Sequence, residues 1–247
     1  ASLHAWEPWV AQLAPDYRIV TLDLPGHGLT LAPKGYAAGV DAYADLSDDL
    51  AQRLQLGRYV VAGNSMGGGV ALDLALRHGE HVRGLVLVDS AGWPRGPRQG
   101  PPPLVVALMR SPIGRAILRN IDTRSLAERG LESAYVNPAL VTKALVDRYV
   151  ELSRAPGHRD ILLTINNHSV RPITPASLAG LKVPSLVMHG EADALIPVAD
   201  GRAFAAAIPG ARLITYPGVG HVPMEQIPGR SAADLKEFLE SLRTGGA

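Results

Sequence analysis

A strand-like run that changes abruptly into a helix-like run constrains this chain more than any other stretch. The strand-like half occupies residues 58–62, the helix-like half occupies residues 70–76, and the join reads Gly63-Asn64-Ser65-Met66-Gly67. Glycines two positions on either side of a serine allow a sharp strand-to-helix turn and hold the serine in a strained, exposed conformation. The stretch therefore predicts a buried parallel strand, a tight turn with Ser65 at its tip, and a helix start whose amides face an oxyanion at Ser65.

This pattern alone leaves two interpretations open. A G-x-S-x-G match arises often by chance, and a glycine-rich turn whose serine only caps a helix gives the same letters. The β-branched residues before the turn and the helix-forming residues after it supply the strand-turn-helix context that a nucleophilic serine requires. They favour the catalytic interpretation of Ser65.

Strands and helices alternate on both sides of this motif. The predicted strands are apolar on both faces, which indicates a mostly parallel sheet flanked by helices, an α/β fold. The predicted strands are residues 17–22, 58–62, 82–88, 183–188 and 211–216. The predicted helices are residues 7–14, 41–57 with Tyr43, Leu46, Leu50 and Leu54 on the inner face, 70–76, 198–208 and a last one capped by Ser231.

A long helical segment interrupts this alternation before the strand at 183–188. Residues 93–103 are rich in proline, glycine and arginine, and residues 104–165 read as helices broken at Pro112, Pro138 and Pro156. We expect residues 1–95 and 177–247 to form the core and residues 96–176 to form a helical cap over the carboxyl ends of the strands. The apolar run at 104–109 either packs within this cap or walls an acyl pocket.

Composition excludes several classes of function. The 247 residues include 24 basic and 23 acidic side chains, so the near-zero net charge gives no indication of a nucleic-acid partner. The absence of cysteine excludes a disulfide framework, a thiolate metal site and a thiol nucleophile. No apolar run is long enough to span a bilayer, and the first residues do not resemble a signal peptide. We expect a cytoplasmic protein that acts on a small molecule, although an upstream signal peptide and the oligomeric state stay open.

Three residues with complementary chemistry each follow a predicted strand. Serine needs a histidine to take its proton and a carboxylate to orient that histidine. Ser65, Asp193 and His221 stand at carboxyl ends of strands, in the chain order serine, acid, histidine. Asp89 also ends a strand and is the alternative acid, although we favour Asp193.

The other histidines have simpler interpretations. His27 and His189 lie in glycine-containing loops beside strand ends, where an imidazole commonly bonds to the backbone, so we expect structural roles for them. The remaining ones lack metal-ligand spacing and are expected on the surface or in the cap, so no metal site is predicted: His78, His81, His158 and His168.

At this point the chain resembles the α/β-hydrolases, specifically lidded serine esterases and lipases. The matching motifs are D-L-P-G-H-G at 23–28, G-N-S-M-G-G at 63–68, D-S-A-G at 89–92, H-G-E-A-D-x-x-I-P at 189–197 and G-x-G-H at 218–221. The resemblance implies Ser65 as nucleophile, Asp193 as orienting acid, His221 as general base, the Met66 amide as oxyanion donor, and no cofactor. We also expect Asn64, Trp93 and Val222 to contact the substrate.

The sequence departs from the family at its start. In the family, the strand before Trp6 ends in an H-G turn that supplies the second oxyanion donor, and this sequence begins after that point. We therefore expect the second donor and the opening strands to be missing from the sequence as given, and residues 1–4 to lie close to Ser65.

The leading functional hypothesis is hydrolysis of small carboxylic esters through an acyl-enzyme. A carbon–carbon bond hydrolase of dienoic ring-fission products and a cofactor-free haloperoxidase or perhydrolase are alternatives within the same framework. A ligand-binding or inactive hydrolase-like protein is the alternative from another class. Dehalogenases and epoxide hydrolases of this fold use an aspartate at the elbow, so Ser65 argues against both.

Overall fold

The computed structural model describes residues 2–94, 108, 111–120, 124–165 and 173–244. Its centre is a four-stranded sheet in which each strand pairs with the next one in sequence, and all three pairings are parallel. The strands are β1 (Tyr59–Asn64), β2 (Val82–Val88), β3 (Ser185–Gly190) and β4 (Arg212–Tyr216). Because every strand runs the same way, the loops that follow the four strands meet at one edge of the sheet. The predicted α/β fold class is confirmed.

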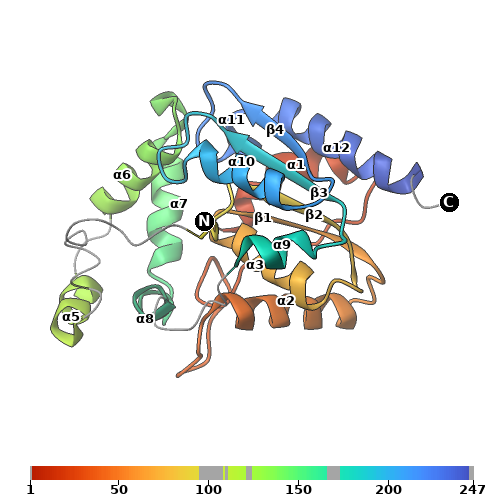
Figure 1. The fold of residues 1–247 in the computed structure, drawn as a ribbon. Helices are drawn as coiled ribbons and strands as arrows, with labels where there is room; N and C mark the ends of the chain where they lie inside the picture. Colours follow the sequence, from red (N-terminus) through yellow and green to blue (C-terminus); the bar gives the residue numbers. More distant parts are fainter. Residues whose placement is uncertain (1, 95–107, 109–110, 121–123, 166–172, 245–247) are drawn as a thin grey trace.

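Helices cover both faces of this sheet (Figure 1). Alternate side chains of β2 point to opposite faces of the sheet. Val86 and Val88 belong to one buried cluster, and Leu85 and Leu87 belong to the other. The first cluster includes residues of α1 (Glu7–Leu13) and α12 (Pro228–Thr244), and the second includes residues of α2 (Val40–Arg53), α3 (Met66–Arg77) and α10 (Val198–Ala207). The apolar strands are thus buried on both sides, as a parallel sheet requires.

A helical region is inserted between β2 and β3, and all of its helices except the last one, α9, lie on the side toward which the strand arrows point in Figure 1. Proline stands at the start of α5 and of η2, and Pro156 separates α7 from α8, so all three expected breaks are confirmed. Of the apolar run at 104–109, only Leu108 lies within the described residues. The inserted elements are α5 (Pro112–Asn120), α6 (Arg124–Ala134), η2 (Pro138–Leu140), α7 (Lys143–Ser153), α8 (His158–Thr164) and α9 (Pro175–Ala179).

Two short elements link the start of the chain to the loop after β4. The 3-10 helix η1 (Leu3–Trp6) contacts α11 (Pro223–Gln226), which begins two residues after His221. Ala5 of η1 and Met224 of α11 belong to the same buried cluster. The start of the chain therefore packs against the segment that carries the predicted general base.

Three details of the predicted elements are wrong. Residues 17–22 form no strand, because a strand needs a ladder partner and, among the described residues, β1 pairs only with β2. Leu46 is exposed, because α2 turns Tyr43, Ala44, Asp48 and Ala51 inward. The last helix begins at Pro228, and Ser231 lies buried inside it.

None of the helices in the described part of the chain is long and apolar enough to cross a lipid bilayer.

Candidate active site

Ser65 occupies a strained turn between β1 and α3. Its backbone has φ 56° and ψ −124°, a conformation that non-glycine residues rarely adopt. The turn is tight because a Cβ on Gly63 would lie 2.0 Å from the carbonyl oxygen of Gly67. Two backbone hydrogen bonds tie the turn to the end of β2: the Ser65 N–H donates to the Val88 oxygen at 3.1 Å, and the Ala91 N–H donates to the Ser65 oxygen at 2.9 Å. The strand-turn-helix geometry expected of a nucleophilic serine is present.

The amide of Met66 lies at the first position of α3. The first N–H groups of a helix have no carbonyl partner within that helix, and they lie at its positive end. The Ser65 carbonyl accepts from the N–H of Gly68, two residues after Met66, at 3.0 Å. The Met66 N–H therefore lies beside Ser65 and makes no hydrogen bond within the helix. The expectation that a second oxyanion donor is missing stays a prediction.

Asp193 and His221 form a direct pair. His221 Nδ1 lies 2.7 Å from Asp193 Oδ2, and both side chains are almost completely buried. Asp193 Oδ1 accepts from the N–H groups of Leu195 at 2.7 Å and Ile196 at 3.0 Å. Burial acts to raise the pKa of Asp193, but hydrogen bonds from His221 and the backbone outweigh it and hold the pKa below its ordinary value. An ionised Asp193 accepts the proton on Nδ1 and leaves Nε2 as the basic nitrogen of His221.

The segment around His221 is fixed from two directions. The His221 N–H donates to the Ala134 oxygen at the end of α6 at 2.8 Å, and the Gly220 N–H donates to Gln226 Oε1 at 2.9 Å. Asn64 Nδ2 donates to the backbone oxygen of His221 at 2.9 Å and to that of Val88 at 3.2 Å. The residue before Ser65 thus holds the segment that carries His221. Sequence reasoning missed these contacts, because they join residues far apart in the chain.

The residues expected to contact substrate lie in different surroundings. The side-chain N–H groups of Asn64 donate to the backbone oxygens of Val88 and His221. Trp93 is half-buried and packs edge-on against Phe204 of α10, with ring centroids 5.2 Å apart. Val222 is buried in the cluster that contains Met224. Their contact with a substrate stays a prediction.

The alternative acid, Asp89, lies beside the pair. One oxygen of Asp89, one of Asp193 and a ring nitrogen of His221 all lie within 4.8 Å of one another. Asp89 is fully buried, and its Oδ1 accepts from the Gly190 N–H at 2.8 Å. The fold therefore brings both candidate acids to the same histidine, but His221 hydrogen-bonds Asp193.

The remaining histidines make structural contacts where they are described. His189 is buried and its Nε2 donates to the Ile196 oxygen at 3.0 Å. His27 packs edge-on against Tyr43, and burial lowers its pKa. His158 is buried in α8 and its Nε2 hydrogen-bonds the Gly28 oxygen at 2.9 Å, which ties the inserted region to the loop at 23–28. His168 lies outside the described residues.

A cluster of residue types that can bind metals lies on α2 and directly after α3. Oxygen and nitrogen atoms of Asp48, His78 and His81 lie within 4.8 Å of one another. His81 Nδ1 already lies 3.0 Å from both Asp48 oxygens, and the Tyr59 hydroxyl donates to Asp48 at 2.6 Å. Sequence spacing missed this cluster because Asp48 comes from a different helix. These hydrogen bonds explain the cluster as a buried carboxylate, Asp48, surrounded by its hydrogen-bond donors.

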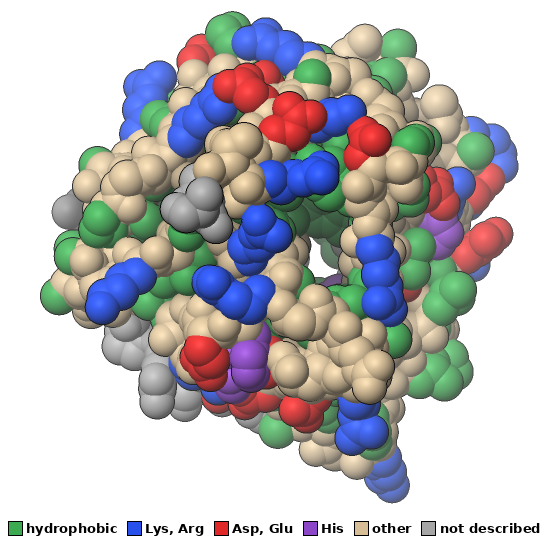
Figure 2. Space-filling model, turned by 90° about the vertical axis from the view of Figure 1, so that its right-hand side faces the viewer, with side chains coloured by type: hydrophobic (Ala, Val, Ile, Leu, Met, Phe, Trp, Pro, Cys, Tyr) green, Lys and Arg blue, Asp and Glu red, His purple; other side chains and the backbone are tan. Residues whose placement is uncertain are grey.

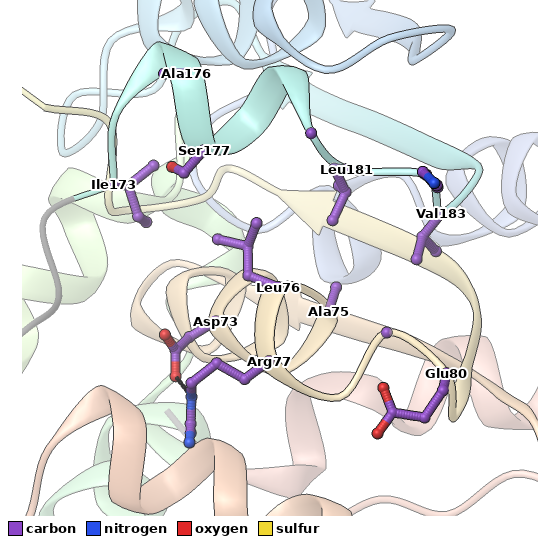
Figure 3. Close-up of a pocket in the computed structure, with 13 residues that line it drawn as sticks. Asp73, Ala75, Leu76, Arg77, Glu80, Ile173, Ala176, Ser177, Leu181 and Val183 are labelled. Atoms are coloured by element: carbon purple, nitrogen blue, oxygen red, sulfur yellow. Dashed lines mark hydrogen bonds and ion pairs between the residues drawn. The ribbon is translucent and has the colours of Figure 1, made fainter.

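A cavity of about 710 Å³ lies between α3 and the segment that leads into β3 (Figure 3). Asp73 and Arg77 line it from α3 and are bonded to each other, with Arg77 Nε 2.7 Å from Asp73 Oδ2. Its lining includes none of Ser65, Asp193 and His221. The cavity is therefore distinct from the candidate active site.

Figure 2 shows the face on the right of Figure 1, at the amino ends of the strands. Lys and Arg side chains gather there around a hollow that has hydrophobic side chains within it. In the sequence, Arg58 and Arg83 stand at or next to the starts of β1 and β2, and Lys182 lies three residues before the start of β3. This basic face lies at the opposite edge of the sheet from the loops that carry Ser65, Asp193 and His221.

Comparison with known proteins agrees with this geometry. The profile described as Alpha/beta hydrolase family matches residues 2–234. A pimeloyl-[acyl-carrier protein] methyl ester esterase of Nitrosomonas europaea is 29% identical over 90% of this chain and 85% of its own length. A 2-hydroxymuconate semialdehyde hydrolase of Pseudomonas sp. strain CF600 is 27% identical over 95% of this chain and 82% of its own. The solved structure of a thermophilic esterase from Thermogutta terrifontis matches with a TM-score of 0.80 at 24% identity, over 98% of this chain and 86% of that one.

Proposed function

Because this chain belongs to the Alpha/beta hydrolase family, we propose that it is a serine hydrolase that cleaves small carboxylic esters. Ser65 is the nucleophile, His221 the general base and Asp193 the acid that orients His221. The observation that carries this assignment is the 2.7 Å contact between His221 Nδ1 and Asp193 Oδ2, in a segment that is hydrogen-bonded to the residue before Ser65.

The reaction proceeds through two half-reactions. His221 Nε2 takes the proton of the Ser65 hydroxyl as Oγ attacks the ester carbonyl, and the resulting oxyanion accepts a hydrogen bond from the Met66 N–H. The tetrahedral intermediate collapses, His221 gives its proton to the leaving alkoxide, and an acyl-enzyme and an alcohol result. Water then attacks the acyl-enzyme while the same histidine takes its proton, and the second tetrahedral intermediate expels Ser65 Oγ. His221 returns the proton to Oγ, so the carboxylic acid leaves and the enzyme is regenerated. Asp193 stays ionised throughout and stabilises the charged imidazole.

A carbon–carbon bond hydrolase acting on dienoic ring-fission products is the second candidate. It is favoured by the 27% identity to the 2-hydroxymuconate semialdehyde hydrolase, which is close to the 29% identity to the methyl ester esterase. The same serine, histidine and aspartate would serve either reaction. Parallel absorbance assays with a short p-nitrophenyl ester and with a dienoate ring-fission product separate the two candidates, because the preferred substrate has the larger kcat/KM.

The Ser65→Ala variant tests the nucleophile. We expect its kcat on the p-nitrophenyl ester to fall on the order of a million-fold, and Asp193→Asn to lose less, because part of the catalysis survives the loss of the orienting acid. The matched control is Ser241→Ala, which removes a hydroxyl on α12 that donates to the Phe238 oxygen 2.7 Å away, on a helix that carries none of the three proposed catalytic residues. Substantial turnover by Ser65→Ala would refute the assignment. A wild-type protein that binds esters or dienoates but turns over neither would indicate the ligand-binding alternative.

A further inference from the structure

Asp89 is a buried carboxyl group that the proposed reaction does not use. It directly follows β2, has no exposed surface, and has a positive φ of 43°. A non-glycine residue in this region of backbone conformation costs about 1–3 kcal/mol and is found mostly where a functional site requires it. The strain turns Asp89 toward Gly190, whose N–H it accepts at 2.8 Å, and toward Asp193.

Apart from His221, which has a ring nitrogen within 4.8 Å and pairs with Asp193, no basic side chain has an ion-pair contact with Asp89 that leaves it a proton to donate among the described residues. His189 Nε2 lies 3.6 Å from Asp89 Oδ1, but its proton is donated to the Ile196 oxygen at 3.0 Å, and burial lowers the pKa of His189. The Tyr216 hydroxyl donates to Asp234 at 2.9 Å. The nearest ionised group is therefore a second carboxylate, that of Asp193.

The two carboxyl groups have opposite electrostatic surroundings. Burial, followed by the negative charge of Asp193, raises the pKa of Asp89 well above its ordinary range, although the Gly190 N–H opposes this. Asp193 has three donors, and its pKa is held low. Two buried carboxyl groups that share a site cannot both ionise cheaply, so the proton stays on the one with fewer donors.

The hydrogen-bond inventory points the same way. Asp89 Oδ2 is buried and has no partner among the described residues if the group is ionised, since a carboxylate only accepts. A buried polar atom without a partner is rare and costs about 1–3 kcal/mol. A proton on this carboxyl group converts the orphaned acceptor into a donor. An oxygen of Asp193 lies within 4.8 Å, and a side-chain hydrogen bond to Asp193 is among the causes that raise the pKa of Asp89.

We propose that Asp89 is a positioning residue that acts as a neutral carboxylic acid and donates a hydrogen bond to the Asp193 carboxylate. This inference deepens the proposed function and rests on it for its kinetic consequences. The added donor fixes the plane of the Asp193 carboxylate against His221 Nδ1. It also keeps the negative charge on Asp193 delocalised, so that the proton between Asp193 and His221 remains on the histidine during catalysis. No proton leaves Asp89 in any step.

Two substitutions at position 89 separate a hydrogen-bond role from a charge role. Asp89→Asn keeps an oxygen for the Gly190 N–H and an N–H donor for Asp193, without any charge. Asp89→Leu fills a similar volume but offers neither. We expect Asp89→Asn to retain kcat within a few-fold of wild type, and Asp89→Leu to lose kcat on the order of 10- to 100-fold with little change in KM. An Asp89→Asn variant that loses as much activity as Asp193→Asn would overturn the proposal, because Asp89 would then be the ionised acid.

A spectroscopic readout covers the case in which Asp89→Leu does not fold. Infrared difference spectra of wild type minus Asp89→Asn, recorded at pH 7 with and without ¹³C-labelled aspartate, should contain the carbonyl band of a neutral carboxylic acid that shifts with the label. The unlabelled glutamates do not contribute to this shift. Absence of the band would refute the neutral state of Asp89 whatever the enzymatic activity. Retained activity in Ser65→Ala would refute the proposed function and leave the band unaffected, so the two failures are distinguishable.

Discussion

The Gly220→Ala substitution tests whether the inserted helices hold His221, the proposed general base, in place. Gly220 precedes His221, and a Cβ built on it lies 2.3 Å from the Ala134 oxygen and 3.1 Å from Gln226 Oε1. The φ of Gly220 is outside the left-handed region, so alanine is compatible with the backbone conformation itself. Any effect of the substitution therefore comes from contact with the end of α6.

The size of the effect follows from that contact. Real Cβ atoms essentially never approach closer than 3.0 Å, so the Ala134 oxygen must move away from its position at 2.3 Å by 0.7 Å or more. That oxygen accepts the His221 N–H at 2.8 Å, so the movement breaks or lengthens this bond. Leaving a buried N–H without its partner costs about 1–3 kcal/mol. A misplacement of about 1 Å at a catalytic group costs on the order of 100-fold in rate.

The measurements are kcat/KM on a p-nitrophenyl ester and the free energy of unfolding in urea. We expect Gly220→Ala to lose both, with the loss of activity mainly in kcat. Gly229→Ala is the matched control, because Gly229 lies near the start of α12 with nothing within 4 Å of an added Cβ. If Gly220→Ala kept the wild-type kcat and unfolding free energy, the contact between α6 and the His221 segment would have no role in holding the base.

Two further substitutions test the packing around the site. Gly68→Ala places a Cβ 2.3 Å from Ser90 Oγ and should lower the unfolding free energy in urea by about 1–3 kcal/mol, whereas Gly67→Ala, with nothing within 4 Å, should not. Tyr135→Phe removes a donor 2.6 Å from Glu225 Oε2, whose pKa burial raises, and should cost about 1.5–3 kcal/mol at pH 7. Because the folded state favours protonated Glu225, stability falls as pH rises from its unfolded pKa of about 4.3 through the raised folded value. The Tyr135 hydroxyl opposes this effect, because its hydrogen bond favours the ionised form of Glu225. The Tyr135→Phe loss should therefore be smaller at pH 4 than at pH 7.

The parts of the site that sequence predicts are those that local chemistry determines. The G-N-S-M-G turn needs glycine at 63 because of an approach to Gly67, only four residues away, and a buried parallel strand needs apolar residues on both faces. These requirements appear in adjacent residues, so the elbow and the four strands of the sheet were predictable. The order of Ser65, Asp193 and His221 was informative because parallel strands bring their carboxyl ends to one edge.

Contacts between distant segments leave no such local pattern. The bond from Asn64 to the His221 oxygen spans 157 positions, and the bond from the Gly190 N–H to Asp89 spans 101. Each uses a common residue type whose partner is a backbone group, and any residue at the partner position supplies that group. The assignment of Leu46 to the inner face of α2 failed for a related reason, since the buried Asp48 is satisfied there by Tyr59 and His81 from other elements.

The inserted helices differ in how they relate to the core. Leu131 of α6 and Val146 of α7 are buried in the same cluster as Val86 and Met188 of the sheet. In contrast, Ile113 of α5 is 77% exposed. Burial of apolar surface stabilises by about 25 cal/mol per Å², so α6 and α7 contribute to the stability of the sheet. Because α6 also supplies the carbonyl that accepts from the His221 N–H, we expect replacement of the inserted region as a unit to displace His221 as well.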